Sequence, residues 1–328
     1  MTPPAVARVF RGTARNLAFL ARRLRDGDLV AVPTETVYGL AANALDASAC
    51  HRIFRAKNRP LHDPLIVHVH SLDQLALVCT PNAAARRLAR EFWPGPLTLV
   101  LPKTKAVPDI VSGGRESVAV RMPSHPLFRR LLKLAGVPLA APSANPFGYV
   151  SPTTAAHVRD GLGRKIRYIL DGGPAEIGLE STIVDLRDPA KPVLLRPGAI
   201  TREAVSRALG CTVKSAPRRA ASAHRAALAP GLLARHYSPR TPLVLHERID
   251  AADDPHHAYL FIRKPAGRAP RNAFWLDARG DLRGAARRLF AMLRRLDAAG
   301  FAAIHAEIAP GDGLAVAIND RLRRAAAR

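Results

Sequence analysis

Short apolar segments alternate with amphipathic segments along most of this chain, and this alternation constrains the fold more than any other feature. The apolar segments have the length of buried strands: LVAVPTET, PLIVHV, TLVLP, SVAVRMP, PLAAP, IRYIL, STIVDL and PVLLRP. Between them lie segments with helical spacing, such as Leu17, Leu20 and Leu24, or with a capping box, Ser71-x-x-Gln74. Further helices are expected at about 46–56, 82–91, 125–135, 153–160 and 201–209. The pattern predicts an α/β fold with a mixed sheet.

The periodicity stops between Thr212 and Arg240, a stretch rich in Ala, Ser and Pro that contains Lys and Arg but no acidic residue. We interpret this stretch as a linker. Beyond it, PLVLHE, AYLFI and AAIHAEI alternate with a helix at about 281–298 and a final helix from Leu314, which predicts a smaller, parallel, Rossmann-like sheet. The expected division is therefore a domain over 1–211, a linker over 212–240 and a second domain over 241–328. The second domain lacks G-x-G-x-x-G, so dinucleotide binding does not follow.

The charge balance points to polyanionic ligands. The 328 residues include 50 Lys and Arg against 26 Asp and Glu, a net charge of +24, which suits nucleic acid, nucleotide phosphates or an anionic surface. The three cysteines lie far apart, so neither a disulfide framework nor a cysteine zinc site is expected. No stretch approaches the roughly 18–20 apolar residues of a membrane span. We expect a cytoplasmic chain without membrane contact.

Familiar nucleotide and protease signatures are absent, so a phosphate would have to be held by other means. Pro60 disfavours helical geometry at Arg59, and in an extended stretch Lys57 and Arg59 would project to the same side. Two such cations suit a di- or triphosphate. The alternative is that they only complement the dipole at a helix C-terminus.

Other polar residues occur where strands are expected to end, which is where open α/β sheets bind ligands. Ser143 and Asn145 lie between prolines in APSANP and could offer a hydroxyl and an amide, or form a plain turn. Thr36 follows a strand, and His68 could donate to a carboxylate or be a structural residue. Arg121 stands in an apolar strand, where a guanidinium needs an anionic partner such as a substrate carboxylate.

Together these segments resemble one family. VPTETVYGLAANA, the Lys57-x-Arg59 pair followed by DPLIVHV, FWPGPLTLVL, VAVRMPSHP, APSANPFG, GLESTIVDL and LLRPGAI occur in the order typical of YrdC-like domains. APGLLARHYSPRTPL resembles the segment that joins this domain to the extra domain of two-domain threonylcarbamoyl-adenylate synthases. The resemblance runs from about residue 14 to the end of the chain.

The resemblance implies a fold and a reaction. The fold is a twisted open α/β sheet around a basic cavity, followed by the small Rossmann-like domain. The reaction joins L-threonine, bicarbonate and ATP into threonylcarbamoyl-adenylate and diphosphate, with Mg²⁺ expected beside the phosphates. A separate transferase would use the product to modify tRNA, and direct contact with tRNA is a further expectation about partners.

The resemblance also implies site residues. The positions that match the family's catalytic and ATP-binding constellation are Lys57, Arg59, Asp63, Ser117, Ser143, Asn145, Ser151, Arg196, His236 and Tyr237. The positions that match its threonine site are Thr36, His68, Arg121, Ala141 and Ser181. No metal ligand is identified.

The chain departs from the family at two places. Asp63 stands where relatives often carry Asn, and a carboxylate there would repel phosphate unless an amine, a hydroxyl or a metal ion balances it. Leu232, Leu233 and Ala234 replace the usual Met, Lys and Tyr before Arg-His-Tyr, so a lid loses its lysine.

Two further functions fit the residues. An RNA-binding module without synthase activity would also have a basic face, and it would show salt-sensitive RNA affinity without threonine-dependent ATP consumption. A carbamoyltransferase with a different acceptor would need additional zinc-finger-like or transferase regions, which this sequence lacks.

Overall fold

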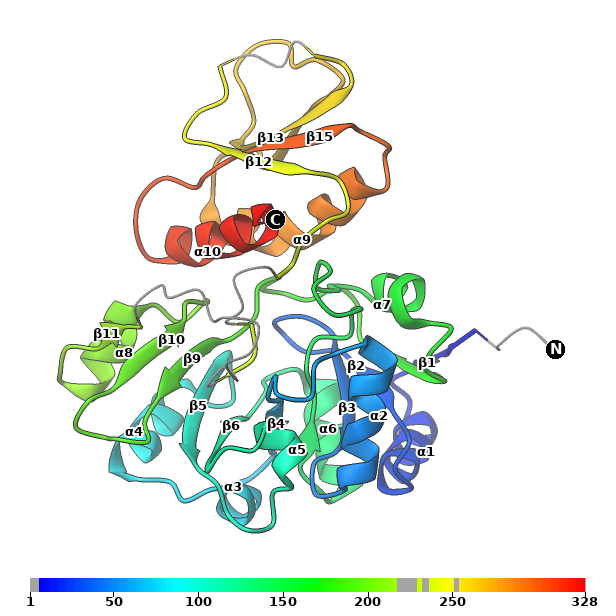
Figure 1. The fold of residues 1–328 in the computed structure, drawn as a ribbon, viewed down its shortest axis with the longest axis vertical. Helices are drawn as coiled ribbons and strands as arrows, with labels where there is room; N and C mark the ends of the chain where they lie inside the picture. Colours follow the sequence, from blue (N-terminus) through cyan, green and yellow to red (C-terminus); the bar gives the residue numbers. More distant parts are fainter. Residues whose placement is uncertain (1–5, 217–228, 232–235, 251–253, 328) are drawn as a thin grey trace.

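The computed structural model describes residues 6–216, 229–231, 236–250 and 254–327, which form two sheets (Figure 1). The strands of the larger sheet are β1 (Arg8–Arg11), β2 (Val30–Val32), β3 (Gly39–Asn43), β4 (Ile66–His68), β5 (Leu97–Pro102), β6 (Ser117–Arg121), β7 (Leu139–Ala140), β8 (Tyr168–Asp171), β9 (Thr182–Asp185), β10 (Val193–Arg196) and β11 (Lys214–Ser215). Their order is β1-β8-β2-β3-β7-β4-β6-β5-β9-β10-β11. Some neighbouring strands of this sheet, such as β4 and β6, are parallel, and others, such as β5 and β6, are antiparallel. The mixed α/β sheet expected from the sequence is confirmed.

Helices cover this sheet, and local sequence explains where several of them begin. They are α1 (Ala14–Arg25), α2 (Ala47–Lys57), α3 (Leu72–Val78), α4 (Ala83–Phe92), α5 (Asp109–Ser112), α6 (Pro126–Ala135), α7 (Ala155–Leu162) and α8 (Arg202–Leu209). The Asp46 carboxylate accepts hydrogen bonds from the first amides of α2, and the Ser71 hydroxyl accepts from the Gln74 amide at the start of α3. These caps fix the helix starts close to the expected positions.

The second sheet is parallel throughout, as the alternation of strands and helices predicts. Its strands are β12 (Leu243–His246), β13 (His257–Arg263), β14 (Ala273–Asp277) and β15 (Ala303–Glu307), in the order β12-β15-β13-β14. Its helices, α9 (Leu282–Asp297) and α10 (Leu314–Ala326), lie between this sheet and the larger unit (Figure 1). Among the described residues, no helix has the length and apolar character needed to cross a bilayer.

Some strands have no clear sequence signal. β1 is RVFR, and its mostly exposed residues do not form an apolar run. The predicted strand LVAVPTET ends at Val32, and the chain returns as the antiparallel strand β3, which the sequence did not separate. β11 adds two residues of the predicted linker to the edge of the sheet, parallel to β10. β14 was also missed, because it follows β13 without a helix between them.

An apolar cluster joins the two units. Val37, Val150 and Leu179 of the larger unit are buried together with Phe290 and other residues of α9 and α10. Apolar area removed from water contributes roughly 25 cal/mol per Å², so a shared core of this kind favours a fixed arrangement of the two units. The loops that carry Val37, Val150 and Leu179 are therefore held from two sides.

Candidate active site

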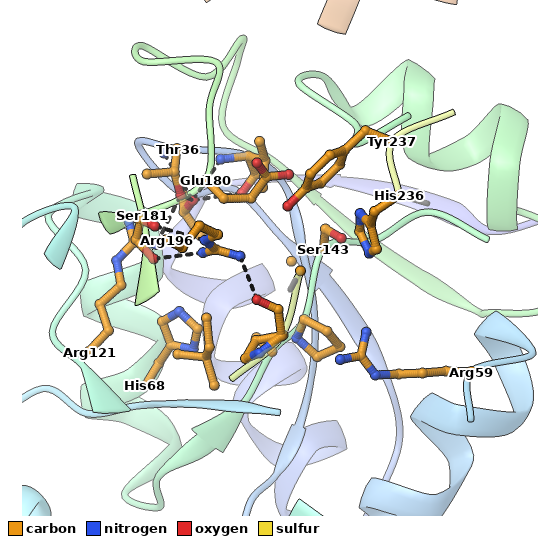
Figure 2. A pocket seen from close by; sticks show the side chains of 18 residues that line it. Thr36, Arg59, His68, Arg121, Ser143, Glu180, Ser181, Arg196, His236 and Tyr237 are labelled. Atoms are coloured by element: carbon orange, nitrogen blue, oxygen red, sulfur yellow. Dashed lines mark hydrogen bonds between the residues drawn. The ribbon is translucent and has the colours of Figure 1, made fainter. Parts of the chain in front are cut away.

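One pocket gathers residues from strand ends that lie far apart in the sequence (Figure 2). His68 ends β4 and Arg121 ends the parallel neighbour β6, where the two residues are directly paired. Ten of the residues predicted from the sequence line this pocket: Thr36, Arg59, His68, Arg121, Ala141, Ser143, Ser181, Arg196, His236 and Tyr237. The structure thus brings most of the predicted site together where parallel strands end.

Arg121 finds its anionic partner within the chain. Its Nη2 forms an ion pair with Oε1 of Glu35 at 2.6 Å, and its Nη1 donates to the Thr36 hydroxyl at 2.9 Å. Burial alone would raise the pKa of the Glu35 carboxyl, but the nearby charge of Arg121 and smaller contributions outweigh this effect and hold the pKa below its ordinary value. Glu35 is therefore ionised, and Arg121 is fixed against Thr36. Sequence reasoning missed Glu35, although it stands next to Thr36 in the quoted motif.

His68 is a neutral imidazole in this pocket. Burial, reinforced by the nearby charge of Arg121, lowers its pKa to about 3. Its ring lies 5.4 Å from that of Phe128, and its Nδ1 is buried without a hydrogen-bond partner in the described part of the chain. A buried ring nitrogen of this kind can bond a ligand without carrying charge.

Ser181 is fixed by two neighbours. Its hydroxyl lies 2.7 Å from that of Thr98, and Nη2 of Arg196 donates to it at 3.1 Å. Arg196 also donates from Nε to the Ser181 carbonyl and from Nη1 to the Pro230 carbonyl at 3.1 Å. Gly231 follows with φ +76°, and a side chain there would meet the Tyr237 hydroxyl and Arg196. Glycine is thus required for this close approach.

Lys57 and Arg59 do not lie in an extended stretch, so the predicted conformation is wrong. Lys57 ends α2, and Asn58 caps the helix in the left-handed conformation with φ 54°. The Lys57 ammonium donates to the carbonyls of Ser143 and Asn145, and is thereby held beneath the loop that carries them. Burial and the charge of Arg59 lower the pKa of this ammonium well below its ordinary value. Lys57 therefore organises the Ser143–Asn145 loop, while Arg59 lines the pocket.

Asp63, the carboxylate noted in the sequence, is the ion-pair partner of Arg59. Nη2 of Arg59 lies 2.9 Å from Oδ2 of Asp63 and donates to the Pro64 carbonyl at 2.7 Å, while Nε donates to the Asp63 carbonyl at 3.1 Å. Burial raises the pKa of the Asp63 carboxyl, and the charges of Arg59 and Lys57 offset this only in part. The acid at this position is balanced by an arginine of the site itself.

His236 and Tyr237 bring the end of the predicted linker over the pocket. Their rings lie 4.1 Å apart, and Tyr237 has φ 63°, a conformation that is uncommon for any residue except glycine. The Tyr237 hydroxyl and Nδ1 of His236 are buried without hydrogen-bond partners, as far as the chain is described. Burial and the nearby arginine and lysine charges lower the pKa of His236 well below its ordinary value. Arg235 and the other linker residues at 217–228 and 232–235 lie outside the described residues.

The remaining predicted residues lie outside the pocket lining. Asn145 is tied through its side-chain amide to the carbonyls of Pro146 and Tyr149, and its Oδ1 has no hydrogen-bond partner among the residues described. The Ser151 hydroxyl donates to Glu180, a pocket residue that the sequence did not single out. Ser117 begins β6, roughly 13 Å along the strand from Arg121 at about 3.3 Å per residue.

The geometry suits positioning and charge neutralisation. Buried guanidinium groups face hydroxyls, a neutral imidazole and an aromatic ring, a donor set that fits an anionic and polar ligand. Within residues 6–216, 229–231, 236–250 and 254–327, no three His, Cys, Asp or Glu side chains are grouped to hold a metal ion.

Comparison with known proteins identifies relatives for both units. A family model for Sua5, YciO and YrdC proteins, described as "Telomere recombination", matches residues 22–198, and a model described as "Threonylcarbamoyl-AMP synthase, C-terminal domain" matches residues 200–327. The chain is 42% identical to the threonylcarbamoyl-AMP synthase of Pyrococcus abyssi, covering 92% of this chain and 91% of that protein. It is 39% identical to the threonylcarbamoyl-AMP synthase of Bacillus subtilis, covering 94% of this chain and 92% of that protein.

Solved structures of proteins with this family's names have the same fold. The crystal structure of P. abyssi Sua5 complexed with L-threonine has a TM-score of 0.89 and 39% identity, covering 98% of both chains. The structure of E. coli YciO has a TM-score of 0.52 and 25% identity, covering 58% of this chain and 96% of that chain.

Proposed function

The chain belongs to the threonylcarbamoyl-AMP synthase family, and on that premise we propose that its pocket joins L-threonine, bicarbonate and ATP into threonylcarbamoyl-AMP and diphosphate. The threonine amine takes up bicarbonate to give a carbamate with loss of water. A carbamate oxygen then attacks the α-phosphorus of ATP, and diphosphate leaves. This assigns the enzyme to the nucleotidyltransferases. The fit of the pocket to this reaction supports synthase activity over an RNA-binding module without activity.

One observation carries the proposal: buried cations and unsatisfied polar atoms surround a single pocket. Arg59 and Arg196 supply positive charge, and His68, His236 and Tyr237 have buried polar atoms without partners in the described part of the chain. Buried polar groups cost free energy unless they are hydrogen-bonded, so these atoms suit a ligand with many oxygens. The reaction needs positioning and charge neutralisation rather than a nucleophilic side chain.

We assign threonine to the wall formed around Arg121. Arg121, held by Glu35, would face the carboxylate together with neutral His68, while Thr36 and Ser181 offer hydroxyls. The Ala141 backbone completes this wall. A site that bonds the threonine hydroxyl leaves its own groups unpaired when that hydroxyl is missing, so valine should be rejected strongly and serine accepted in part.

We assign ATP to the wall formed around Arg59. Arg59, Arg196 and Ser143 line the pocket there, Lys57 and Asn145 shape its loop, and His236 with Tyr237 closes it. The other positions proposed for ATP are Asp63, through its pairing with Arg59, and Ser117 and Ser151. In proteins Mg²⁺ usually binds substrate phosphates together with one or two carboxylates. Mg²⁺ would therefore enter with ATP and neutralise its phosphates.

We further propose a division of labour along the chain. Residues 1–211 would bind both substrates, 212–240 would act as a linker and lid, and 241–328 would support the site as a separate domain. Closure of His236 and Tyr237 over the ligands would shield a labile carbamoyl-adenylate from water. We propose that a separate transferase then moves the threonylcarbamoyl group to tRNA, and that the reaction takes place in the cytoplasm with direct tRNA contact.

The test uses the purified full chain with ATP, bicarbonate and each amino acid in turn, monitored for diphosphate release. We expect release that requires threonine and bicarbonate together. Equal release with valine and threonine would contradict the threonine assignment. Salt-sensitive RNA binding without any amino-acid-dependent release would overturn the synthase function.

A further inference from the structure

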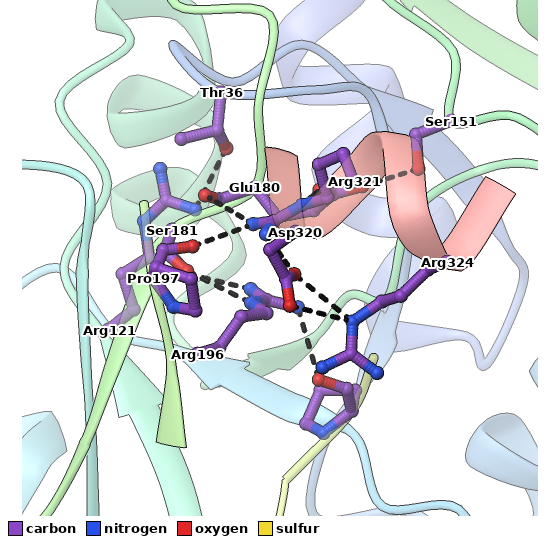
Figure 3. A network of polar contacts seen from close by, with 11 residues as sticks. Thr36, Arg121, Ser151, Glu180, Ser181, Arg196, Pro197, Asp320, Arg321 and Arg324 are labelled. Carbon is purple, nitrogen blue, oxygen red and sulfur yellow. Dashed lines mark hydrogen bonds and ion pairs between the residues drawn. The ribbon is translucent and has the colours of Figure 1, made fainter. Parts of the chain in front are cut away.

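Arg321 reaches from the last helix of the second unit into the wall of the pocket (Figure 3). Its side chain is fully buried. Nε donates to Oε2 of Glu180 at 2.8 Å, and Nη2 donates to the Pro197 carbonyl at 3.0 Å. Arg321 and Glu180 are 141 positions apart in the chain. The helix thus supplies a cation to a loop of the larger unit.

Glu180 links Arg321 to two residues that are proposed to bind substrates. Its Oε1 accepts a hydrogen bond from the Ser151 hydroxyl at 2.5 Å, while Oε2 accepts from Arg321. Glu180 itself lines the pocket and directly precedes Ser181. One carboxylate therefore fixes both a residue proposed for ATP and the backbone of a residue proposed for threonine.

The same guanidinium also supports the aromatic cover of the pocket. Its central carbon lies 5.4 Å from the centre of the Tyr237 ring, a cation–π contact. Asp320 holds Arg321 from the opposite side, with its Oδ2 2.7 Å from Nη1. One turn further along the helix, the Arg324 carbonyl accepts a hydrogen bond from the His236 amide at 3.3 Å. α10 therefore fixes the pocket loop and the end of the linker together.

Close backbone contact shows that the loop before Glu180 has a set position against the second unit. Gly178 has φ +76°, and a side chain there would lie 2.5 Å from the Arg287 carbonyl oxygen of α9. On the other loop, Nη2 of Arg294 donates to the Val150 carbonyl beside Ser151. Both loops that contribute to the Glu180 contact are thus docked on α9.

We propose that Arg321 is a positioning residue for the synthase site, which makes α10 part of the active-site architecture. This inference rests on the proposed function. The fork of its guanidinium sets the place of the Glu180 carboxylate, and through it of Ser151 and Ser181, while its face sets the place of Tyr237. A buried ion pair is weak support for stability, because desolvation of both groups offsets their attraction. The value of the pair lies in placing these groups.

The test compares Arg321→Lys with Arg321→Met in the full chain. Lysine keeps the charge but loses the planar fork, so it cannot hold Glu180 and the Pro197 carbonyl together. We expect both variants to raise the KM for threonine and for ATP by roughly ten- to a hundredfold, since small misplacements of positioning groups have effects of this size. Arg323→Lys is the matched control, because Arg323 lies on the same helix and is exposed. It should leave both KM values unchanged.

A purely structural role predicts a different result. Loss of folded protein lowers the amount of active enzyme and therefore the apparent kcat, but it leaves KM unchanged. Wild-type KM values for both substrates in Arg321→Lys would overturn the proposal. If the Arg321 variants do not fold, Glu180→Gln tests the same contact from the larger unit, and wild-type KM values there would also overturn it.

Threonine binding separates this proposal from the proposed function. Calorimetry with threonine alone requires no turnover, so it reports on positioning even if the wild type releases no diphosphate. Weaker threonine binding by Arg321→Lys than by Arg323→Lys supports the positioning role, and equal binding overturns it. Failure of the wild type to release diphosphate counts against the synthase function alone.

Discussion

Two of the arginine–carboxylate pairs at the pocket, Arg121 with Glu35 and Arg59 with Asp63, differ in how firmly the carboxylate is held ionised. Arg121 and Glu35 lie 2.6 Å apart, and Arg59 and Asp63 lie 2.9 Å apart, with all four side chains buried. The pKa of Glu35 is lowered, because Arg121 outweighs the effect of burial, whereas burial dominates at Asp63 and raises its pKa. The Glu35 carboxylate therefore stays ionised beside Arg121, and we call this the committed pair. The Asp63 carboxyl takes up a proton at a higher pH than an ordinary aspartate does.

This difference matches the ligands proposed for the two walls. Arg121 uses Nε for the Gly95 carbonyl, Nη1 for Thr36 and Nη2 for Glu35, so its orientation is settled before threonine arrives. Arg59 uses Nε and Nη2, and its Nη1 makes no hydrogen bond with the described part of the chain. A rigid wall suits a small substrate that is selected by shape. A wall with an uncommitted donor suits a polyphosphate that brings its own negative charge.

The largest effect should come from breaking the committed pair. Arg121→Met leaves the Glu35 carboxylate buried without its cation, which costs about 3–5 kcal/mol of unfolding free energy. Urea unfolding at pH 7 measures this loss. Arg323→Met, at an exposed position, should change stability by no more than about 0.5 kcal/mol. A small loss at Arg121 would show that Glu35 is not held as an ion.

On the nucleotide wall, Lys57 should matter for ATP through the loop that it supports. Lys57→Met removes the hydrogen bonds from Nζ to the carbonyls of Ser143 and Asn145, each worth roughly 0.5–1.5 kcal/mol. We expect kcat/KM for ATP to fall ten- to a hundredfold while the chain stays folded. Arg55→Met is the control, since Arg55 is exposed on the same helical turn. Unchanged ATP kinetics in a folded Lys57→Met variant would refute this role.

The two walls also differ in how much of each could be predicted from the sequence. Residues at strand ends could be predicted, because buried parallel strands such as PLIVHV and SVAVRMP place His68 and Arg121 at one edge. Glu35 has no such signal, since its burial depends on Arg121, a partner far along the chain. The prediction that Lys57 and Arg59 lie in an extended stretch failed because α2 continues to Lys57 and Asn58 ends it in the left-handed conformation. The effect of Pro60 on Arg59 alone does not show where the helix ends.

Arg321 shows the limit more clearly. Within the sequence RLRRAAAR it looks like one of several surface cations on a basic helix. It is instead fully buried, while Arg323 two residues later is exposed. The two arginines differ because α10 docks on the loop of Glu180, which is a tertiary contact between the two units. The run of basic residues around Arg321 does not show which arginine makes this contact.

Substitutions that keep the side-chain shape but remove the carboxylate test how the stability contributed by each pair depends on pH. Glu35→Gln and Asp63→Asn each leave a buried guanidinium without its anion, and at pH 7 we expect the larger loss of unfolding free energy for Glu35→Gln, because burial makes the ionised form of Asp63 itself costly. Ionised Glu35 contributes stability above about pH 4.5, the ordinary value, and this is lost as the pH falls further. Ionisation of Asp63 instead costs stability as the pH rises above its ordinary 3.8.

Urea unfolding between pH 7 and pH 4 measures both variants against the wild type. The advantage of the wild type over Glu35→Gln should shrink as the pH falls. Against Asp63→Asn the wild type should gain stability over the same range. The same pH response in both variants would remove the distinction between the two pairs.

The smallest expected effect is the absence of a pH response in threonine binding. The pKa of His68 is lowered to about 3 by burial, so the imidazole stays neutral from pH 5.5 to pH 8. Threonine is a zwitterion over this range, so neither partner changes charge on binding. Calorimetric titration with threonine alone, without ATP or bicarbonate, should give the same Kd at pH 5.5, 6.5 and 7.5. A Kd that tightens as the pH falls through about 6.5, and loses this dependence in His68→Gln, would show that a charged imidazolium recognises the carboxylate. The positive charge of His68 would then add to that of Arg121 in holding the threonine carboxylate.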